Sequence, residues 1–224
     1  MPELPEVETV RRTLTPAIGA RIAAVWDSGM PLHMKRRPPR RKLQALVGAK
    51  ITGVRRHGKY LLVDTDRPES LLVHLGMTGR LCIHKKRAPR APHTHLVLDL
   101  GTRELRFSDP RRFGLLDVLV REREREHPAL AVLGPDALVH GVDPAARLAV
   151  ARSRRRSTLQ AFLLDQSVSA GVGNISASES SWRECLRPTT RTYRLTGPAA
   201  SRFAAAVREV IANALENGGT TLSD

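Results

Sequence analysis

Cysteine and long apolar runs are both scarce in this 224-residue sequence. The two cysteines, Cys82 and Cys185, lie far apart and have no partners at metal-binding spacing, so neither a disulfide framework nor a metal site can be argued. No stretch approaches the roughly 20 apolar residues that a membrane-spanning helix needs. Residues 2–6 lack the basic and apolar regions of a signal peptide. We therefore expect a soluble, cytoplasmic protein with no metal and no other cofactor.

Acidic residues are few compared with basic ones. The chain has 37 Lys and Arg against 22 Asp and Glu, a formal net charge of +15 and a pI of about 11.2. Such an excess of positive charge favours a polyanionic partner, either nucleic acid or an anionic membrane surface. The basic, proline-containing residues 35–42 are consistent with a solvated loop or with a segment that contacts nucleic acid.

The apolar pattern predicts an α+β fold in two domains. Residues 5–14 have helical spacing, with acidic residues near the start and Arg11 and Arg12 later, which suits the helix dipole. Short β-like runs separated by Gly, Pro or charged turns follow at residues 22–26, 50–54, 60–63, 71–75, 81–84, 95–100, 104–107 and 113–119. They predict a domain over residues 1–126 that consists of an antiparallel β-sandwich with the N-terminal helix at its start.

The β signals stop after the charged run at residues 121–126. Helical patterns occupy residues 145–153, 158–164, 174–185 and 198–217, and the pair Gly218 and Gly219 is a plausible stop for the last of them. We therefore expect an all-helical domain over residues 127–224.

The first residues of the chain suggest nucleophilic chemistry. A proline at position 2 lets the initiator methionine be removed, which leaves Pro2 with a free secondary amine. An α-amino group has a pKa of about 7.7–8.0, so part of it is nucleophilic near neutral pH. Condensation with an aldehyde carbon gives an iminium ion, which is an electron sink, and the neighbouring Glu3 is placed to move protons. Taken alone, Pro2 and Glu3 are better explained as a proline and a carboxylate at a helix start.

Four further motifs accompany the opening MPELPEVETV. They are RHGKYLL at residues 56–62, HLGMTG at 74–79, DPRRFG at 109–114 and LLDQSVSAGVGNI at 163–175. In this order and spacing they resemble the formamidopyrimidine-DNA glycosylase family over essentially residues 1–224. The resemblance implies a bacterial base-excision-repair enzyme, acting as a monomer on damaged double-stranded DNA near the nucleoid. It further implies removal of 8-oxoguanine and formamidopyrimidines, followed by β-elimination at the abasic site.

The resemblance also implies roles for individual residues. Pro2 corresponds to the Schiff-base nucleophile that attacks the deoxyribose C1′, and Glu3 to its acid/base partner. Lys59 resembles the family's strand-borne lysine that assists sugar opening and elimination, although alone it reads as an exposed lysine at a strand start. Glu6 matches a carboxylate that orients the amine. These four are the expected catalytic residues.

Chemistry on a base requires its removal from the helix stack, and the vacated space must be filled. Met77, Arg111 and Phe113 match the family's three intercalating residues. The positions of DNA contact in the family correspond to His93, Arg111 and Arg155, while Asn174 opens a helix whose N-terminus suits phosphate binding. Arg155 and Asn174 belong to the expected helix–two-turn–helix element.

The chain departs from the family pattern in three places. Most members continue beyond the Gly-Gly-Thr-Thr-Leu segment into a four-cysteine zinc finger, whereas this chain ends at Asp224. We expect weaker DNA binding and no δ-elimination from the loss of the zinc finger, and both a fragment and a naturally shortened protein remain open. Ser176 replaces a tyrosine and Gln160 a basic residue, and neither change is expected to touch the N-terminal chemistry.

Three other interpretations remain open at this stage. The chain is also compatible with the oxidised-pyrimidine branch of the same superfamily, although Leu4-Pro5 and the arginine-flanked Phe113 argue mildly against it. A damage-binding protein that lost turnover with its zinc finger is the alternative from another class. A general RNA-binding protein explains the charge but not the N-terminal motif.

Overall fold

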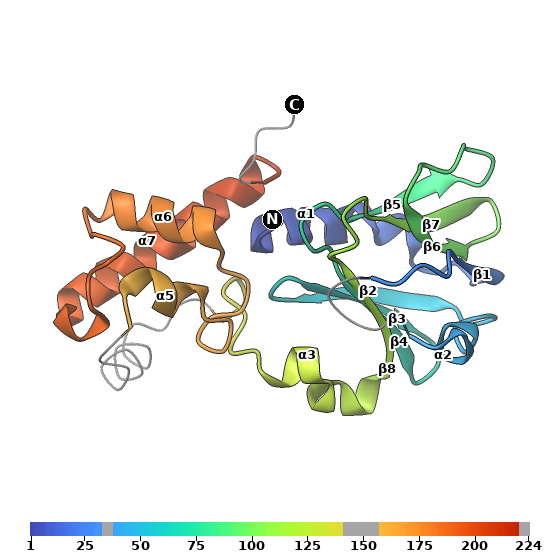
Figure 1. The fold of residues 1–224 in the computed structure, drawn as a ribbon, viewed down its shortest axis with the longest axis horizontal. Helices are drawn as coiled ribbons and strands as arrows, with labels where there is room; N and C mark the ends of the chain where they lie inside the picture. The colour runs from blue at the N-terminus through green and yellow to red at the C-terminus, as the bar shows by residue number, and fades with distance from the viewer. Residues whose placement is uncertain (33–37, 141–156, 220–224) are drawn as a thin grey trace. The chain divides into compact units, whose positions relative to one another are not determined.

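The computed structural model describes residues 1–32, 38–140 and 157–219, and the chain divides into two compact units (Figure 1). Unit 1 comprises Met1–Pro2 and Val7–Ala131, and unit 2 comprises Glu3–Glu6 and Val132–Asp224. The domain boundary predicted after residue 126 lies between Val120, where the last strand of unit 1 ends, and Ala131, where unit 1 itself ends. Among the described residues, no helix combines the length and the apolar character that crossing a membrane requires.

Unit 1 contains two four-stranded antiparallel sheets. One has the order β1-β6-β7-β5 and the other β2-β3-β4-β8. Their strands are β1 (Ala24–Asp27), β2 (Ile51–His57), β3 (Tyr60–Thr65), β4 (Glu69–His74), β5 (Arg80–Lys85), β6 (Thr94–Asp99), β7 (Arg103–Ser108) and β8 (Leu115–Val120). The expected α+β class and the antiparallel sheets of the N-terminal part are confirmed.

Successive side chains of β3 point to two opposite faces, and both faces are buried. Leu61 and Val63 of β3 pack with Leu98 and Phe107 of the other sheet in one buried core. The intervening Leu62 points to the opposite face, into a smaller cluster with Ala129 of helix α3 (Pro128–Ala131). Both faces of β3 are therefore buried, which gives its nearly continuous apolar sequence.

Several short helical segments of unit 1 were not predicted. These are η1 (Thr15–Ala17), α2 (Arg40–Gln44), η2 (Arg121–Glu126) and α3. α2 covers the end of the basic stretch 35–42, so the loop interpretation is wrong for its last residues, while residues 33–37 lie outside the described part. Each segment is too short to show a helical apolar repeat, and only Leu43 of α2 is buried.

The N-terminal helix α1 (Leu4–Thr13) confirms the helix expected at residues 5–14. Leu4 packs in the core of unit 2, whereas Val7 and Leu14 pack in the core of unit 1. Within unit 1, the buried Glu8 forms ion pairs with Arg11 at 2.8 Å and with the buried Arg56 of β2 at 3.1 Å. These pairs attach α1 to the strand that leads into the β2–β3 turn.

Unit 2 is helical in the described residues. Its helices are α5 (Leu159–Leu164), α6 (Asn174–Arg183), η3 (Thr192–Arg194) and α7 (Gly197–Glu216). Thr158 and Thr196 cap α5 and α7 by accepting hydrogen bonds from backbone N–H groups. Gly218, with a φ of 76°, follows the end of α7 as expected for a left-handed stop. The helix expected at residues 145–153 lies outside the described residues.

We predict that the Glu8 ion pairs make the stability of the protein acid-sensitive. Burial by itself would raise the pKa of Glu8, but hydrogen bonds from Arg11 and Arg56 outweigh it and lower the pKa to about 2. The folded state then binds the proton less readily than the unfolded state, whose carboxyl has a pKa near 4.5. The stabilisation is complete above about pH 4.5 and disappears as the pH falls toward 2.

The free energy of unfolding in urea should therefore fall by about 2 kcal/mol across this window because of Glu8, after allowance for solvent screening. Glu8→Gln should remove that part of the pH dependence. Glu126→Gln is the control, since Glu126 pairs with Arg123 on the surface. Equal pH curves for Glu8→Gln and the unmodified protein would contradict this role of Glu8.

Candidate functional site

The carboxylate of Glu3 is buried in unit 2, with a relative exposure of 2%. Its Oε1 accepts a hydrogen bond from the Ile175 N–H at 2.8 Å. Its Oε2 accepts two hydrogen bonds, from the Ser176 N–H at 3.1 Å and from the Ser176 Oγ at 2.6 Å. These donors are in the first turn of α6, 172 and 173 positions away in the sequence. The expectation that Ser176 does not touch the N-terminal chemistry is therefore wrong.

Glu3 takes the place of a missing helix cap. The N-cap residue of α6 is Gly173, which makes no side-chain cap hydrogen bond. The Ile175 and Ser176 N–H groups, which a cap side chain normally satisfies, donate to Glu3 instead. A carboxylate at this end of the helix is also favoured by the helix dipole. The N-terminus of α6 thus fixes the position of the Glu3 side chain.

Two glycines allow this close approach. A Cβ atom on Gly173 would lie 2.2 Å from the Glu3 Cδ, so any side chain there would displace the carboxylate. Gly171 has a φ of 109°, and a Cβ there would lie 2.5 Å from the Leu4 Cδ1. The Leu4 N–H also donates to the Gly171 carbonyl at 3.1 Å. The Gly-Val-Gly motif is therefore required for packing against residues 3 and 4.

The other predicted N-terminal residues lie around Glu3. The backbone N–H of Glu3 donates to the Glu6 Oε2 at 2.7 Å, which ties the start of α1 to its own first turn. Glu6 and the preceding Pro2 are both half-buried. Glu3 is thus held through its backbone by Glu6 and through its carboxylate by α6.

Lys59 lies in the two-residue turn that joins β2 and β3, where His57 pairs with Tyr60. Gly58 supplies the positive φ, 56°, as in type II′ hairpin turns. Lys59 is 7% exposed, so the reading as an ordinary exposed lysine is wrong, and it precedes β3 rather than belonging to a strand. Arg56 supports the turn by donating to the Gly58 carbonyl at 3.0 Å while it pairs with Glu8.

The three predicted void-filling residues lie in loops of unit 1. Met77 is 42% exposed in the turn between β4 and β5. The guanidinium of the exposed Arg111 lies 4.6 Å from the ring centroid of the half-buried Phe113. Phe113 was also expected to open the last strand, but β8 begins at Leu115 because the Gly114 N–H donates to a carboxylate instead of a neighbouring strand.

That carboxylate belongs to Asp109, which is fully buried. Its Oδ2 accepts from the Gly114 N–H at 2.7 Å, and its Oδ1 accepts from the Thr78 Oγ at 2.5 Å and the Arg111 N–H at 3.3 Å. Its backbone N–H donates to the carbonyl of His93, an exposed residue with a φ of 62°. Asp109 therefore organises the loops that carry Met77, His93, Arg111 and Phe113. Asp109 opens the DPRRFG motif, but no local sequence pattern indicates this role.

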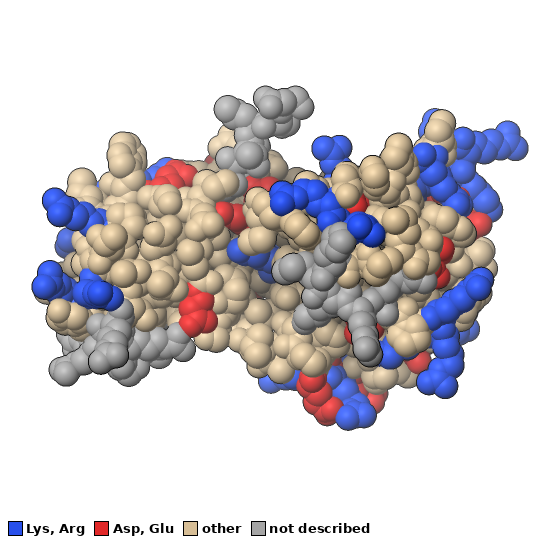
Figure 2. Space-filling model, in the orientation of Figure 1, with Lys and Arg blue, Asp and Glu red and all other residues tan. Residues whose placement is uncertain are grey.

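The remaining predicted contacts lie in unit 2. Asn174 is exposed and is the first residue of α6, whereas Arg155 lies outside the described residues. Figure 2 shows Lys and Arg side chains on the visible faces of both units, with Asp and Glu fewer among them. The positive charge predicted to favour a polyanion is therefore accessible at the surface.

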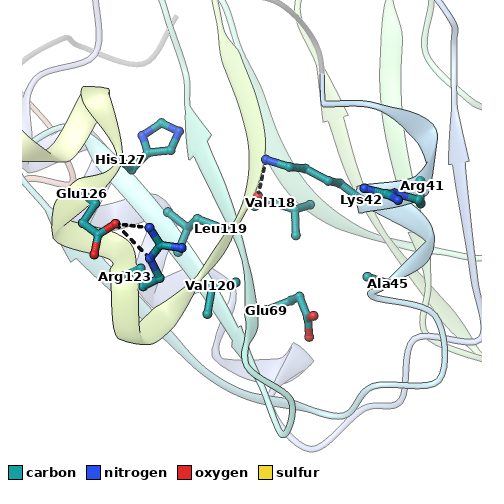
Figure 3. Close-up of a pocket in the computed structure, with 10 residues that line it drawn as sticks. All are labelled: Arg41, Lys42, Ala45, Glu69, Val118, Leu119, Val120, Arg123, Glu126 and His127. Atoms are coloured by element: carbon teal, nitrogen blue, oxygen red, sulfur yellow. Dashed lines mark hydrogen bonds and ion pairs between the residues drawn. The ribbon is translucent and has the colours of Figure 1, made fainter.

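A pocket of about 400 Å³ in unit 1 is separate from these residues (Figure 3). Its lining comes from α2, β8 and η2 with their flanks and from Glu69 at the start of β4, and includes none of the predicted site residues. Lys42 at its edge donates to the Val118 carbonyl, and Arg123 pairs with Glu126. The charged groups at its rim are of both signs and partly paired with one another, so the pocket does not select one class of ligand.

The described residues do not fit a zinc site. No group of three or more His, Cys, Asp or Glu side chains within residues 1–32, 38–140 and 157–219 is arranged to hold a metal ion. Cys82 is half-buried on β5 and Cys185 is exposed after α6. No step of the chemistry is therefore assigned to a metal here.

Comparison with known proteins relates both units to one family. Residues 1–116 match the model of the formamidopyrimidine-DNA glycosylase N-terminal domain, and residues 133–224 match the model of the formamidopyrimidine-DNA glycosylase H2TH domain. The chain is 40% identical over 234 residues to formamidopyrimidine-DNA glycosylase from Cereibacter sphaeroides strain ATCC 17025. It is 43% identical over 233 residues to the enzyme of that name from Xanthomonas campestris pv. campestris. Each alignment covers 100% of this chain and 82% of the relative.

Solved structures with the same fold contain DNA. Wild-type Lactococcus lactis Fpg (MutM) bound to DNA containing N7-benzyl-Fapy-dG has a TM-score of 0.90 at 28% identity, covering 100% of this chain and 82% of that one. The same organism's protein bound non-covalently to DNA with an abasic site has a TM-score of 0.88 at 28% identity, covering 97% and 83%.

We predict that Asp109→Ala destabilises the protein by roughly 3 kcal/mol, because it leaves the Thr78 hydroxyl and the Gly114 N–H without their buried acceptor. Urea unfolding measures the change. Asp66→Ala is the matched control, since Asp66 is exposed and accepts one backbone hydrogen bond from Lys50. The control should cost less than about 1 kcal/mol, and equal losses in the two variants would refute the role of Asp109.

Proposed function

The chain belongs to the formamidopyrimidine-DNA glycosylase family, and on that premise we propose that it excises oxidised purines from double-stranded DNA through a covalent intermediate on Pro2. Its substrates are 8-oxoguanine and formamidopyrimidines. Excision is followed by β-elimination at the abasic site, which makes the protein both a glycosylase and an abasic-site lyase. We expect it to act as a monomer in the bacterial cytoplasm.

The observation that best supports this proposal is the anchoring of Glu3 next to Pro2. Glu3 is held by the Glu6 carboxylate at its backbone and by the first turn of α6 at its side chain. The adjacent Pro2 nitrogen is therefore attached to a fixed point, as a nucleophile must be for a near-attack geometry. Removal of Met1 converts that nitrogen from an amide into a secondary amine.

The reaction then follows from ordinary amine chemistry. The Pro2 nitrogen attacks C1′, the bond from C1′ to the base breaks, and the sugar ring opens to an iminium ion. Glu3 is the nearest carboxylate in sequence and transfers protons during base loss and ring opening. The iminium withdraws electrons, so loss of a C2′ proton expels the 3′ phosphate.

Lys59 assists ring opening and elimination in this proposal. A buried ammonium is strongly constrained, and the Gly58 turn together with Arg56 fixes the backbone from which Lys59 projects. Such a fixed cation suits a sugar or phosphate oxygen better than a mobile surface lysine would.

Met77, Arg111 and Phe113 fill the space left by the extruded nucleotide. A thioether and an aromatic ring replace lost stacking, and the Arg111 guanidinium has hydrogen-bond donors for the unpaired base. The contact between Arg111 and Phe113 and the hydrogen bonds of Asp109 hold these groups in a preset arrangement before DNA arrives. His93, Asn174 and Arg155 contact the phosphate backbone, helped by the net charge of +15.

Borohydride trapping tests the function directly. The purified chain should form a covalent adduct with a duplex containing one 8-oxoguanine or one abasic site, since borohydride reduces the iminium to a stable amine. Pro2→Gly should abolish or sharply reduce the adduct while duplex binding on a gel remains.

Mass spectrometry of the same preparation should show that Met1 is absent. Binding of the damaged duplex without any adduct would instead identify a damage-binding protein that does not turn over. Retention of Met1 would leave no amine at residue 2, and the proposed mechanism would then be wrong.

We predict that Lys59→Ala keeps duplex affinity but lowers strand cleavage by about tenfold to a hundredfold, the range for loss of one acid/base or electrostatic group. Cleavage is measured in single turnover on an end-labelled duplex. Lys50→Ala is the control, because Lys50 is exposed just before the opposite end of β2. Unchanged cleavage in Lys59→Ala would remove this residue from the mechanism.

A further inference from the structure

Ser176 is a position where this chain departs from the family pattern, and its side chain lies directly on Glu3. Ser176 is fully buried, and its Oγ is 2.6 Å from the Glu3 Oε2. This is the shortest of the three hydrogen bonds to that carboxylate. A tyrosine at this position could not place a hydroxyl on the same oxygen from the same Cα, because its oxygen is at the far end of a ring. The contact is therefore specific to the serine.

The three hydrogen bonds are divided unequally between the two oxygens of Glu3. A carboxylate has about four acceptor positions, two on each oxygen. Oε2 accepts from both the N–H and the hydroxyl of Ser176, whereas Oε1 accepts, among the described residues, from the Ile175 N–H alone. Within the described part of the chain, Oε2 is thus fully occupied and one acceptor position remains on Oε1.

We propose that Ser176 is a positioning residue that occupies Oε2 of Glu3 and so directs proton transfer to Oε1. This inference rests on the proposed function, in which Glu3 moves protons during base excision. Ser176 is buried, so it acts through the carboxylate and not by direct contact with a ligand at the surface. Without its hydroxyl, Oε2 would regain a free acceptor position and the carboxylate would lose one of three restraints on its rotation.

The same helix supplies a matched control. Ser181 is also buried on α6, but its Oγ donates to the Ala177 carbonyl at 2.7 Å and does not contact Glu3. Ser180 is less suitable, because its Oγ donates to the carbonyl of Ser176 itself. Ser176→Ala and Ser181→Ala each remove one buried hydroxyl from one helix, and only the first removes a hydrogen bond to the carboxylate.

The test is a double-mutant cycle with Glu3→Gln, in which one carboxylate oxygen becomes an amide nitrogen that cannot accept. Excision of 8-oxoguanine is followed in single turnover, and affinity is measured on a duplex with an unreactive tetrahydrofuran abasic analogue. Ser176→Ala should slow excision about tenfold at unchanged affinity, as expected for loss of one hydrogen bond to a charged group. In the Glu3→Gln background it should cause no further slowing.

Three results would overturn the proposal. These are excision by Ser176→Ala at the unmodified rate, an equal slowing by Ser181→Ala, and effects of Ser176→Ala and Glu3→Gln that multiply. A chain that excises nothing would contradict the proposed function itself. The same cycle followed by urea unfolding then decides separately whether Ser176 holds Glu3, with non-additive losses expected for Ser176→Ala and additive losses for Ser181→Ala.

Discussion

The arrangement of the candidate site depends on one buried carboxylate that must find hydrogen-bond donors. Leaving the charge of Glu3 without partners inside a protein would cost several kcal/mol. The protein resolves this by placing the carboxylate at the start of α6, where N–H groups lack partners of their own. The absence of a side chain at Gly173 follows from the same requirement, because a Cβ there would lie 2.2 Å from the Glu3 Cδ. The hydrogen bonds that stabilise the buried Glu3 carboxylate are therefore the same ones that position it for its proposed catalytic role.

A second buried carboxylate has an equivalent effect in unit 1. Asp109 accepts hydrogen bonds from the loops that bear Met77, Arg111 and Phe113, which are exposed or half-buried. In both units an internal acid orders the backbone, and the residues proposed to meet DNA extend from that ordered backbone. Because the buried acid orders the backbone, exposed side chains on loops can be held in place without being buried themselves.

Sequence patterns predicted the local structure well where the signal was periodic. The eight strands and the helices α1, α5, α6 and α7 were each anticipated within a few residues, because alternating or helical apolar spacing reports which face is buried. The short helices α2 and α3 were missed because four or five residues contain little more than one turn, which is too short for an apolar position to repeat along one face. The start of β8 was misplaced because the partner of the Gly114 N–H is a carboxylate, which strand propensity does not register.

The sequence by itself determined the class of fold, the family and the identity of the N-terminal groups, since composition, periodicity and motif order are properties of the linear chain. Only the tertiary structure decided that Lys59 is buried, that Asp109 joins separate loops and that Ser176 donates to Glu3. Hydrogen bonds between residues 31 or 173 positions apart leave no local trace. Such pairs form only when folding has already brought two distant segments within about 3 Å of each other.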